Sequence, residues 1–370
     1  MSGMTTRGAL ASALRSISQQ HRSARNEGSP TYFSDIDFDK PGKQCGYVYF
    51  PHSPHDDAWG TQRVPLAVIA NGDGPTILLE GGNHGDEYEG PIALGELIRT
   101  LDPLRIRGRL IIIPAINAPA VDAGKRTSPV DGKNMNRVFP GDHGGTITEQ
   151  IAAFVNDELL PRCDALLSLH SGGSSLNIVP STIVTPCADP AQFQRCLASA
   201  QVFGAPMCVV MNNLGDSRLC VTAALAAGMT CVSTEMAGGG VVTRSALELC
   251  RQGLMRVLRF WGVMADEAPA VEPAQQSYFE LRGAGAYVIA SEHGVFEPGA
   301  EIGDRVEAGG VAGRIHFLTS PDKEPVTLHF KESGVVYCTR QYGIVRPGSA
   351  CAVVASPRAG QFARVTGAHQ

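Results

Sequence analysis

The sequence predicts an α/β fold with a largely parallel sheet, followed by a small all-β domain. From about Val64 to Gly262, apolar runs of four to six residues alternate with helix-length amphipathic segments, and this alternation is typical of layered α/β folds. Segment 265–276 is rich in alanine, proline and acidic residues, which is the composition of a linker. Beyond it, short strand-like runs stand between Pro, Gly and Asp turns, a pattern that predicts a β-domain.

The elements follow in regular order along the chain. Apolar runs rich in Ile, Val and Leu predict strands at 76–79, 109–114, 165–169, 207–211 and 230–233. Amphipathic segments predict helices at 90–101, 146–160, 188–203, 220–227 and 243–261. Thr146 is placed to cap the second helix, with Glu149 reaching back to it. In the C-terminal part, strands are predicted at 287–290, 294–297, 313–317, 326–330, 334–338 and 351–354.

These patterns divide the chain into a flexible extension (1–26), a large domain (27–264), a linker (265–276), a β-domain (277–356) and a tail (357–370). The extension carries four arginines and no acidic residue, so it resembles an organellar transit peptide. The favoured alternative is a frayed amphipathic helix over 9–19. The apolar core of a secretory signal is missing.

Length, charge and cysteine content exclude several classes of protein. A chain of 370 residues is long enough for one large and one smaller domain. Its 31 basic and 36 acidic residues give a net charge of −5, and the basic residues are scattered, so we expect no nucleic-acid partner. No apolar stretch approaches the length that spans a bilayer. The ten cysteines include no CxxC pair and lie mostly in apolar runs, which predicts reduced thiols and a cytoplasmic protein.

The most informative stretch is 76–87, an apolar run that ends in a glycine-rich loop with His84 and, three residues later, Glu87. The run 165–169 ends in the same way, at His170 followed by Ser-Gly-Gly. Two imidazoles and one carboxylate at strand ends are the ligand set of a catalytic zinc site with one position open. One zinc ion there would activate water and polarise a carbonyl, which suits amide hydrolysis. The alternative is a helix-start carboxylate beside a loop histidine.

Two further polar residues, Asn117 and Glu235, also follow directly on predicted strands. Because ligands bind beyond the carboxyl ends of strands in such sheets, we expect them to share one sheet edge with His84 and His170. Glu235 stands in a glycine-rich turn and is the candidate general base. Its alternative role is to cap the helix that begins near residue 243.

The polar loop 126–141 supplies the candidate substrate-binding residues. An arginine fork matches a carboxylate, so Arg137 with Asn136 could hold a substrate carboxylate. Arg126 could face a developing oxyanion. A solvated surface loop is the alternative interpretation. A zinc-ligating imidazole also needs an acceptor for its second nitrogen, which Asp86 or a backbone carbonyl could supply.

As a set, these residues occur in the order found in zinc carboxypeptidase-like proteins. More closely, the chain resembles the succinylglutamate desuccinylase/aspartoacylase family and, within it, the N-acetyl-2,4-diaminobutyrate deacetylases. Four segments carry this resemblance, which extends over about 38–356: 56–60, 81–90, 126–132 and 313–317.

The resemblance implies a zinc-carboxypeptidase-like fold: a mixed, mostly parallel sheet with helices on both faces and a barrel-like C-terminal domain. It implies a hydrolase of N-acyl L-amino acids, with N-acetyl-2,4-diaminobutyrate as the first-choice substrate. It also implies a homodimer. The implied roles are zinc binding by His84, Glu87 and His170, and proton transfer by Glu235. Alternatives are a deacylase of acidic or amide amino acids, a zinc exopeptidase and a non-catalytic binding module.

The resemblance also implies that Arg126 polarises the acyl carbonyl, while Asn136 and Arg137 hold the amino acid carboxylate. Side-chain specificity is expected from segment 211–219. There, Asp216 is a candidate partner for a substrate ammonium group.

Arg218, in the same segment, favours an acidic or amide side chain in the substrate instead. Aspartoacylases also use a tyrosine from the C-terminal domain, for which Tyr337 and Tyr342 are the candidates. The β-domain resembles a biotinyl/lipoyl-like barrel, and we interpret it as a wall over the active site.

Overall fold

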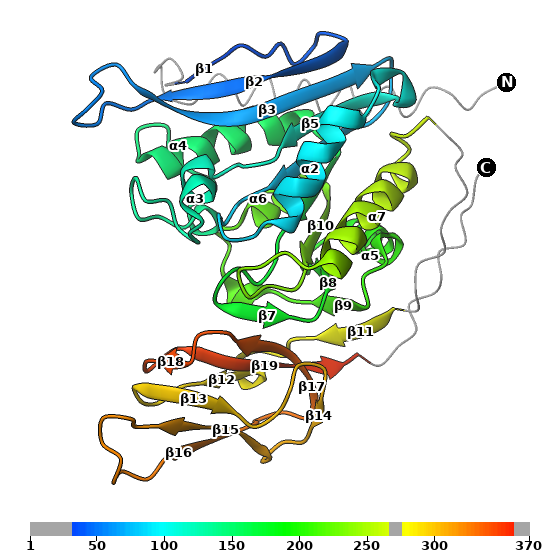
Figure 1. The fold of residues 1–370 in the computed structure, drawn as a ribbon. Helices are drawn as coiled ribbons and strands as arrows, with labels where there is room; N and C mark the ends of the chain where they lie inside the picture. Colours follow the sequence, from blue (N-terminus) through cyan, green and yellow to red (C-terminus); the bar gives the residue numbers. More distant parts are fainter. Residues whose placement is uncertain (1–31, 266–275, 359–370) are drawn as a thin grey trace, which may run out of the picture.

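The computed structural model describes residues 32–265 and 276–358. The N-terminal extension with its predicted helix, nearly all of the linker and most of the tail lie outside the described residues. Elements carry the labels of Figure 1. Among the described residues, no helix combines the length and apolar character needed to cross a membrane.

All five predicted helices are present: α2 (Glu89–Thr100), α4 (Ile147–Phe154), α5 (Pro190–Phe203), α6 (Cys220–Ala226) and α7 (Arg244–Phe260). Thr146 is the N-cap of α4, and its backbone N–H donates to Glu149 as predicted, at 2.9 Å. The helix expected to reach residue 160 changes to a π-helical turn, Val155–Leu159, and then to a 3-10 turn, Leu160–Arg162. Pro161 explains the end of the helix, because proline has no backbone N–H to donate.

The five predicted strands of the large domain are also present: β4 (Thr76–Gly81), β5 (Gly108–Ile113), β6 (Ala165–Leu169), β9 (Met207–Val210) and β10 (Thr230–Glu235). Both β4 and β6 are buried along their whole length. Strands buried on both faces are continuous apolar runs, which is why the sequence revealed them.

Other elements were missed: β1 (Phe33–Ser34), β2 (Gly42–Pro51), β3 (Thr61–Asn71), β7 (Leu176–Ile178), β8 (Ser181–Val184) and the helix α3 (Ala118–Ala123). Exposed and buried residues are mixed along β2, so it lacks a continuous apolar run. β7 and β8 have only three and four residues, too few for a periodic pattern.

The large sheet is mixed, with a parallel group of strands at its centre. Its order is β1-β2-β3-β5-β4-β6-β10-β8-β9-β11-β19-β17-β14. The strands β5, β4, β6 and β10 run parallel, whereas β3 and β8 run antiparallel to these neighbours. The sheet is therefore mixed: β8, β9 and β11 are also parallel to one another, whereas the N-terminal hairpin and the strands from β19 onward add antiparallel pairs.

Helices cover both faces of this sheet. The connections β4–α2–β5 and β5–α4–β6 cross the sheet in opposite directions, so right-handed crossovers place α2 and α4 on opposite faces. On one face, α7 contacts both α2 and α5. On the other, α6 contacts the π-helical turn that follows α4.

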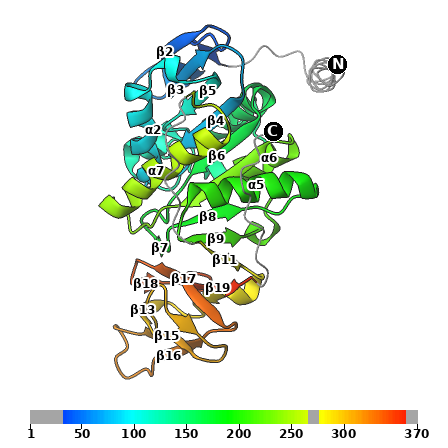
Figure 2. The same ribbon diagram turned by 90° about the vertical axis from the view of Figure 1, so that its right-hand side faces the viewer.

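The C-terminal strands are β11 (Ser277–Glu280), β12 (Tyr287–Ile289), β13 (Gly294–Pro298), β14 (Arg305–Val306), β15 (Val311–His316), β16 (Val326–His329), β17 (Gly334–Arg340), β18 (Ile344–Val345) and β19 (Ala350–Pro357). Figures 1 and 2 show most of them together, at the end of the molecule opposite β1–β3. Four of these strands form a separate antiparallel sheet in the order β16-β15-β13-β18. Closure into a barrel stays a prediction.

Hydrogen bonding crosses the predicted boundary at residue 277. β11 pairs in parallel with β9 and antiparallel with β19, so strands of the β-domain extend the large sheet. A buried cluster that includes Ile183, Val209, Tyr337 and Val353 packs the two parts together. In addition, β17 pairs with β7, which lies just beyond His170.

Candidate metal centre

Neighbouring parallel strands bring the candidate ligands together. β4 pairs with β6, and the register places Gly81 opposite Leu169. The loop after β4 carries His84 and Glu87, and His170 follows β6 directly. All three side chains therefore emerge at the same edge of the sheet, as the strand-end argument predicts.

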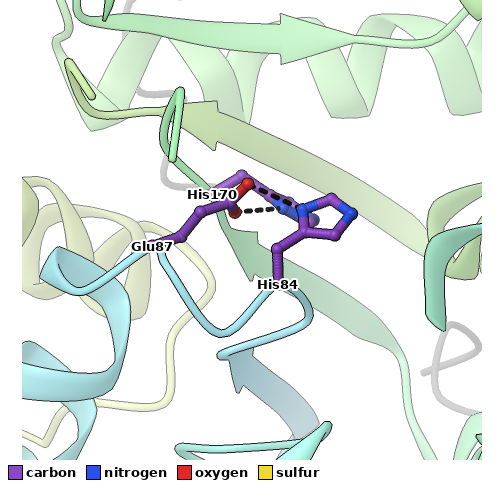
Figure 3. Close-up of side chains that lie close together, drawn as sticks. All are labelled: His84, Glu87 and His170. Carbon is purple, nitrogen blue, oxygen red and sulfur yellow. Dashed lines mark hydrogen bonds and ion pairs between the residues drawn. The ribbon is translucent and has the colours of Figure 1, made fainter. Parts of the chain in front are cut away.

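The three side chains converge on one point. Glu87 Oε1 lies 2.6 Å from His84 Nδ1, and Glu87 Oε2 lies 2.8 Å from His170 Nδ1. Figure 3 shows the carboxylate facing both imidazole rings. The possible ligand atoms lie within 4.8 Å of one another, the only such group of three His, Cys, Asp or Glu found in 32–265 and 276–358. This donor set of two nitrogens and a carboxylate suits zinc.

Burial and mutual charge shift the pKa values in this cluster. Burial, with the positive charges of Arg126 and His170, lowers the pKa of His84 against the opposing effect of the Glu87 carboxylate. For His170, burial is outweighed by the charges of Glu87 and Glu235, and the pKa rises to about 9. Burial opposes ionisation of Glu87, but the two histidines hold the pKa of that carboxyl well below its usual range. Without a metal, the site therefore favours an ionised Glu87 beside a protonated His170. A bound cation would displace the His170 proton, because an imidazole coordinates a metal only in its neutral form.

Asn134 orients the first of these imidazoles. Its Oδ1 lies 3.1 Å from His84 Nε2, so the imidazole can donate there and keep the lone pair of Nδ1 directed at the centre. Oδ1 also accepts from the backbone N–H of Asn136 at 2.9 Å. We expected Asp86 or a carbonyl as this acceptor. Asp86 instead accepts hydrogen bonds from the backbone and hydroxyl of Ser174, each at 2.7 Å.

Asn134→Ala is expected to weaken metal affinity by about 10- to 100-fold, the usual effect of losing an outer-shell partner. Competition with a chromophoric chelator measures this affinity. Asn134→Asp keeps an acceptor oxygen at the same place and should retain most of it. Equal affinity of the wild type and Asn134→Ala would show that this contact does not orient His84.

Glu235 ends β10 beside the metal centre. The register places it opposite Ser181 of β8, and the next residue, Met236, donates its backbone N–H to the carbonyl of His170 at 2.9 Å. The sharp turn that follows contains Ala237 at φ 78° and Gly238 at φ 143°. A Cβ at position 238 would overlap the carbonyl of Leu176, so this close approach requires glycine.

One carboxylate oxygen of Glu235 is open to a hydrogen bond from a ligand. Oε2 is buried and has no hydrogen-bond partner among the residues the structure describes. Burial and the negative charge of Glu87 raise the pKa of Glu235 to about 8, against the opposing charges of His170 and Arg126. A bound dication would lower that pKa and so favour the ionised form. The capping alternative finds no support, since Thr243 accepts from Ala246 N at the start of α7.

Arg126 reaches the metal centre from the polar loop. Its Nη1 lies 3.6 Å from Glu87 Oε1 and 3.3 Å from His84 Nδ1. Its side chain remains 43% exposed, so the guanidinium stands at the border between the ligand cluster and solvent. A group approaching the metal centre from solvent would meet it.

Asn136 and Arg137 lie in the 3-10 turn Met135–Arg137. Asn136 Oδ1 accepts from the backbone N–H of Cys220 at 3.0 Å, so part of this amide caps the start of α6. Arg137 Nε lies 3.1 Å from Asp216 Oδ2. Arg137 also lines an open depression of about 600 Å³, together with residues 213–218.

The tyrosine candidates occupy different positions. Tyr337 is buried, and its hydroxyl lies 2.8 Å from Ser181 Oγ. Burial, together with the charge of Glu235, raises its pKa well above the usual value, so Tyr337 is a neutral neighbour of the site. Tyr342 is 51% exposed. Asn117 is buried at the N-cap of α3 and contacts the carbonyl of Asn83.

The sequence of this chain is similar to those of known proteins. A family model described as the succinylglutamate desuccinylase/aspartoacylase catalytic domain matches residues 73–261. The N-alpha-acetyl-L-2,4-diaminobutyric acid deacetylase of Halomonas elongata is 39% identical over 320 residues, which cover 86% of this chain and 93% of that protein.

Two solved structures match over 89% of this chain and 100% of their own. A succinylglutamate desuccinylase/aspartoacylase from Rhodobacter sphaeroides has a TM-score of 0.84 at 38% identity. The product-bound ectoine utilization protein EutE (DoeB) from Ruegeria pomeroyi has a TM-score of 0.85 at 36% identity.

Proposed function

The chain belongs to the succinylglutamate desuccinylase/aspartoacylase family, and on this premise we propose that it is a zinc-dependent hydrolase of N-acyl L-amino acids. The first-choice substrate is N-acetyl-L-2,4-diaminobutyrate, because the relative from Halomonas elongata carries that specificity in its name. The observation that carries the proposal is the convergence of His84 and His170 on Glu87, with the unpaired oxygen of Glu235 buried nearby.

His84, Glu87 and His170 would hold one zinc ion per chain. When bound, zinc supplies Lewis acidity toward water and the acyl carbonyl. Asn134 keeps the His84 ring oriented through Nε2. The protein contributes a prearranged set of ligands, which costs little reorganisation when the substrate arrives.

Glu235 would act as the general base. Its buried Oε2 would accept the proton that water loses on attacking the acyl carbon, and it would return a proton to the departing amine nitrogen. Arg126, at the solvent side of the ligand cluster, would stabilise negative charge on the carbonyl oxygen. Buried Tyr337 contacts Ser181 of β8, the strand that pairs with the strand of Glu235, and in this scheme it donates no proton to the substrate.

Asn136 and Arg137 would bind the α-carboxylate of the amino acid moiety. The guanidinium of Arg137 lines the open depression beside residues 213–218, where a carboxylate could enter from solvent. An arginine fork provides paired N–H donors for such a group.

A second candidate is a deacylase of acidic or amide amino acids. Its supporting observation is the surplus of positive charge in the depression, where Arg137 and Arg218 stand against Asp216 alone. An acidic substrate side chain would benefit from that surplus, whereas an ammonium group would be repelled.

A substrate panel tests both candidates. Zinc-loaded enzyme is assayed with N-acetyl-L-2,4-diaminobutyrate, N-acetyl-L-glutamine, N-acetyl-L-aspartate, the N-succinyl and N-formyl counterparts, and a dipeptide. We expect the highest kcat/KM with acetyl-diaminobutyrate. Preference for the aspartate or glutamine derivatives would favour the second candidate, and preference for the dipeptide would indicate an exopeptidase. Absence of hydrolysis across the panel would contradict the proposed function.

A further inference from the structure

The carboxylate of Asp216 is already saturated by arginine. Arg218 pairs with it in a fork, with Nε 3.0 Å from Oδ1 and Nη2 3.0 Å from Oδ2. Oδ1 also accepts from the backbone N–H of Arg218 at 3.0 Å. Oδ2 additionally faces Arg137 Nε at 3.1 Å. Three hydrogen bonds and one ion-pair contact thus engage the two oxygens, so little accepting capacity remains for a substrate ammonium group.

Two contacts of the Arg137 guanidinium determine which of its nitrogens is open to the depression. Asp216 forms an ion pair on the Nε side of the guanidinium, and the backbone carbonyl of Asn136 accepts a hydrogen bond from Nη1 at 2.6 Å. Within 32–265 and 276–358 no group accepts a hydrogen bond from Nη2, so its two hydrogens are open to a ligand. A guanidinium held at two points loses less conformational freedom on binding a carboxylate than one that rotates freely.

The segment that carries Asp216 is shaped by its own turns and hydrogen bonds. Asn213 and Leu214 adopt left-handed φ values of 49° and 56°, and Asn212 Oδ1 accepts from the backbone N–H of Leu214 at 3.1 Å. The next turn closes through a 3.2 Å hydrogen bond from Asp216 N to the carbonyl of Asn213. Asp216 is therefore supported by its own backbone and does not depend on a ligand for its position.

The same segment is anchored to the loop that carries Arg137. After residue 219 the chain enters α6, whose first backbone N–H, at Cys220, donates to Asn136 Oδ1. The 3-10 turn Met135–Arg137 and segment 212–220 thus meet at two neighbouring contacts, one through Asn136 and one between Arg137 and Asp216. Both contacts fix the direction of adjacent residues of the turn.

We propose that Asp216 is a positioning residue that aims Arg137 at the α-carboxylate of the substrate and does not select its side chain. This inference rests on the proposed function and deepens it. Arg218 acts on Arg137 indirectly, because its two hydrogen bonds hold the Asp216 carboxylate that contacts Arg137.

The local charges agree with this role. The hydrogen bonds and charge of Arg218 lower the pKa of Asp216 to about 2, so the carboxylate is ionised at neutral pH. Burial and the positive charges of Arg126 and Arg218 act against the charged form of Arg137, and Asp216 opposes them. Without Asp216, the guanidinium would be repelled by two cations and would have no anion to hold it in place.

Asp216→Asn tests the proposal. We expect KM to rise about tenfold for the N-acetyl derivatives of L-2,4-diaminobutyrate, L-glutamine and L-aspartate alike. This increase lies between the small effect of losing a surface ion pair and the large effect of misplacing a group that binds the substrate. The kcat value should change little, as expected for uniform binding. The matching α-carboxamides should be unaffected. Calorimetric binding of each free amino acid and its amide gives the same contrast without turnover.

A double-mutant cycle provides the decisive comparison. If Asp216 acts through Arg137, Asp216→Asn should add nothing in an Arg137→Ala background. Arg218→Gln should raise KM less than Asp216→Asn, again for all three side chains. Glu280→Gln is the matched control, since Glu280 pairs with Arg282 two residues later in the β-domain and should leave KM unchanged.

Each contrary result has a distinct meaning. A rise in KM confined to diaminobutyrate would make Asp216 an ammonium receptor and overturn the proposal. Additive effects of the Asp216 and Arg137 substitutions, or no effect of Asp216→Asn, would overturn it as well. A wild type that hydrolyses none of the three substrates would contradict the proposed function itself.

Discussion

Replacing Glu235 with glutamine is expected to lower kcat by about 10²- to 10⁴-fold, the usual contribution of general acid–base catalysis. Glutamine has nearly the same shape but cannot accept and return a proton. KM and bound metal should change little, because Glu235 is not one of the three converging ligands. Oε2 of Glu235 is buried and has no donor among the described residues, which favours a catalytic role over a purely structural one.

Steady-state kinetics with the best substrate of the panel, together with metal analysis, measure this effect. Glu280→Gln at the end of β11 is the control for replacing a strand-end glutamate by its amide. Near-normal turnover of Glu235→Gln would remove Glu235 from the mechanism. Loss of metal together with turnover would instead place it among the groups that stabilise the metal centre.

Removal of the metal is expected to abolish turnover, with a loss of about 10³-fold or more, since a Lewis acid contributes several kcal/mol to such reactions. Dialysis against a chelator should produce this loss, and added zinc should restore activity. His170→Ala should give the same loss, which zinc should not restore at ordinary concentrations, because one of the three ligands is missing.

Elemental analysis of the active enzyme should find one zinc ion per chain. His316→Ala is the matched control, because His316 also pairs with a glutamate, Glu297, at 2.6 Å but lies on β15 of the β-domain. That variant should keep its metal and its activity. Full activity in His170→Ala, or active enzyme without stoichiometric metal, would contradict the metal centre.

The strands that carry the metal centre were predictable because a strand buried on both faces is a continuous apolar run in the sequence. β4 and β6 are continuous apolar runs, and each ends in a glycine-rich loop with a histidine. β2 was not predicted, since its mixed exposure leaves no such run. β3 was missed although it contains the buried apolar run 66–70. The continuation of the large sheet into the β-domain was also missed, because pairing of β11 with β9 joins segments far apart in sequence.

The sequence by itself determined the chemical groups and their place at strand ends: His84, Glu87, His170 and Glu235. Strand ends are predictable because hydrophobic burial follows a local period, and parallel neighbours share one edge. Only the tertiary structure decided the partners of these groups. The contacts of Asn134 with His84 and of Asp216 with Arg137 depend on how loops 50 or more residues apart meet. Directional hydrogen bonds between distant loops leave no periodic trace, so an isolated asparagine or aspartate in the sequence does not reveal its partner.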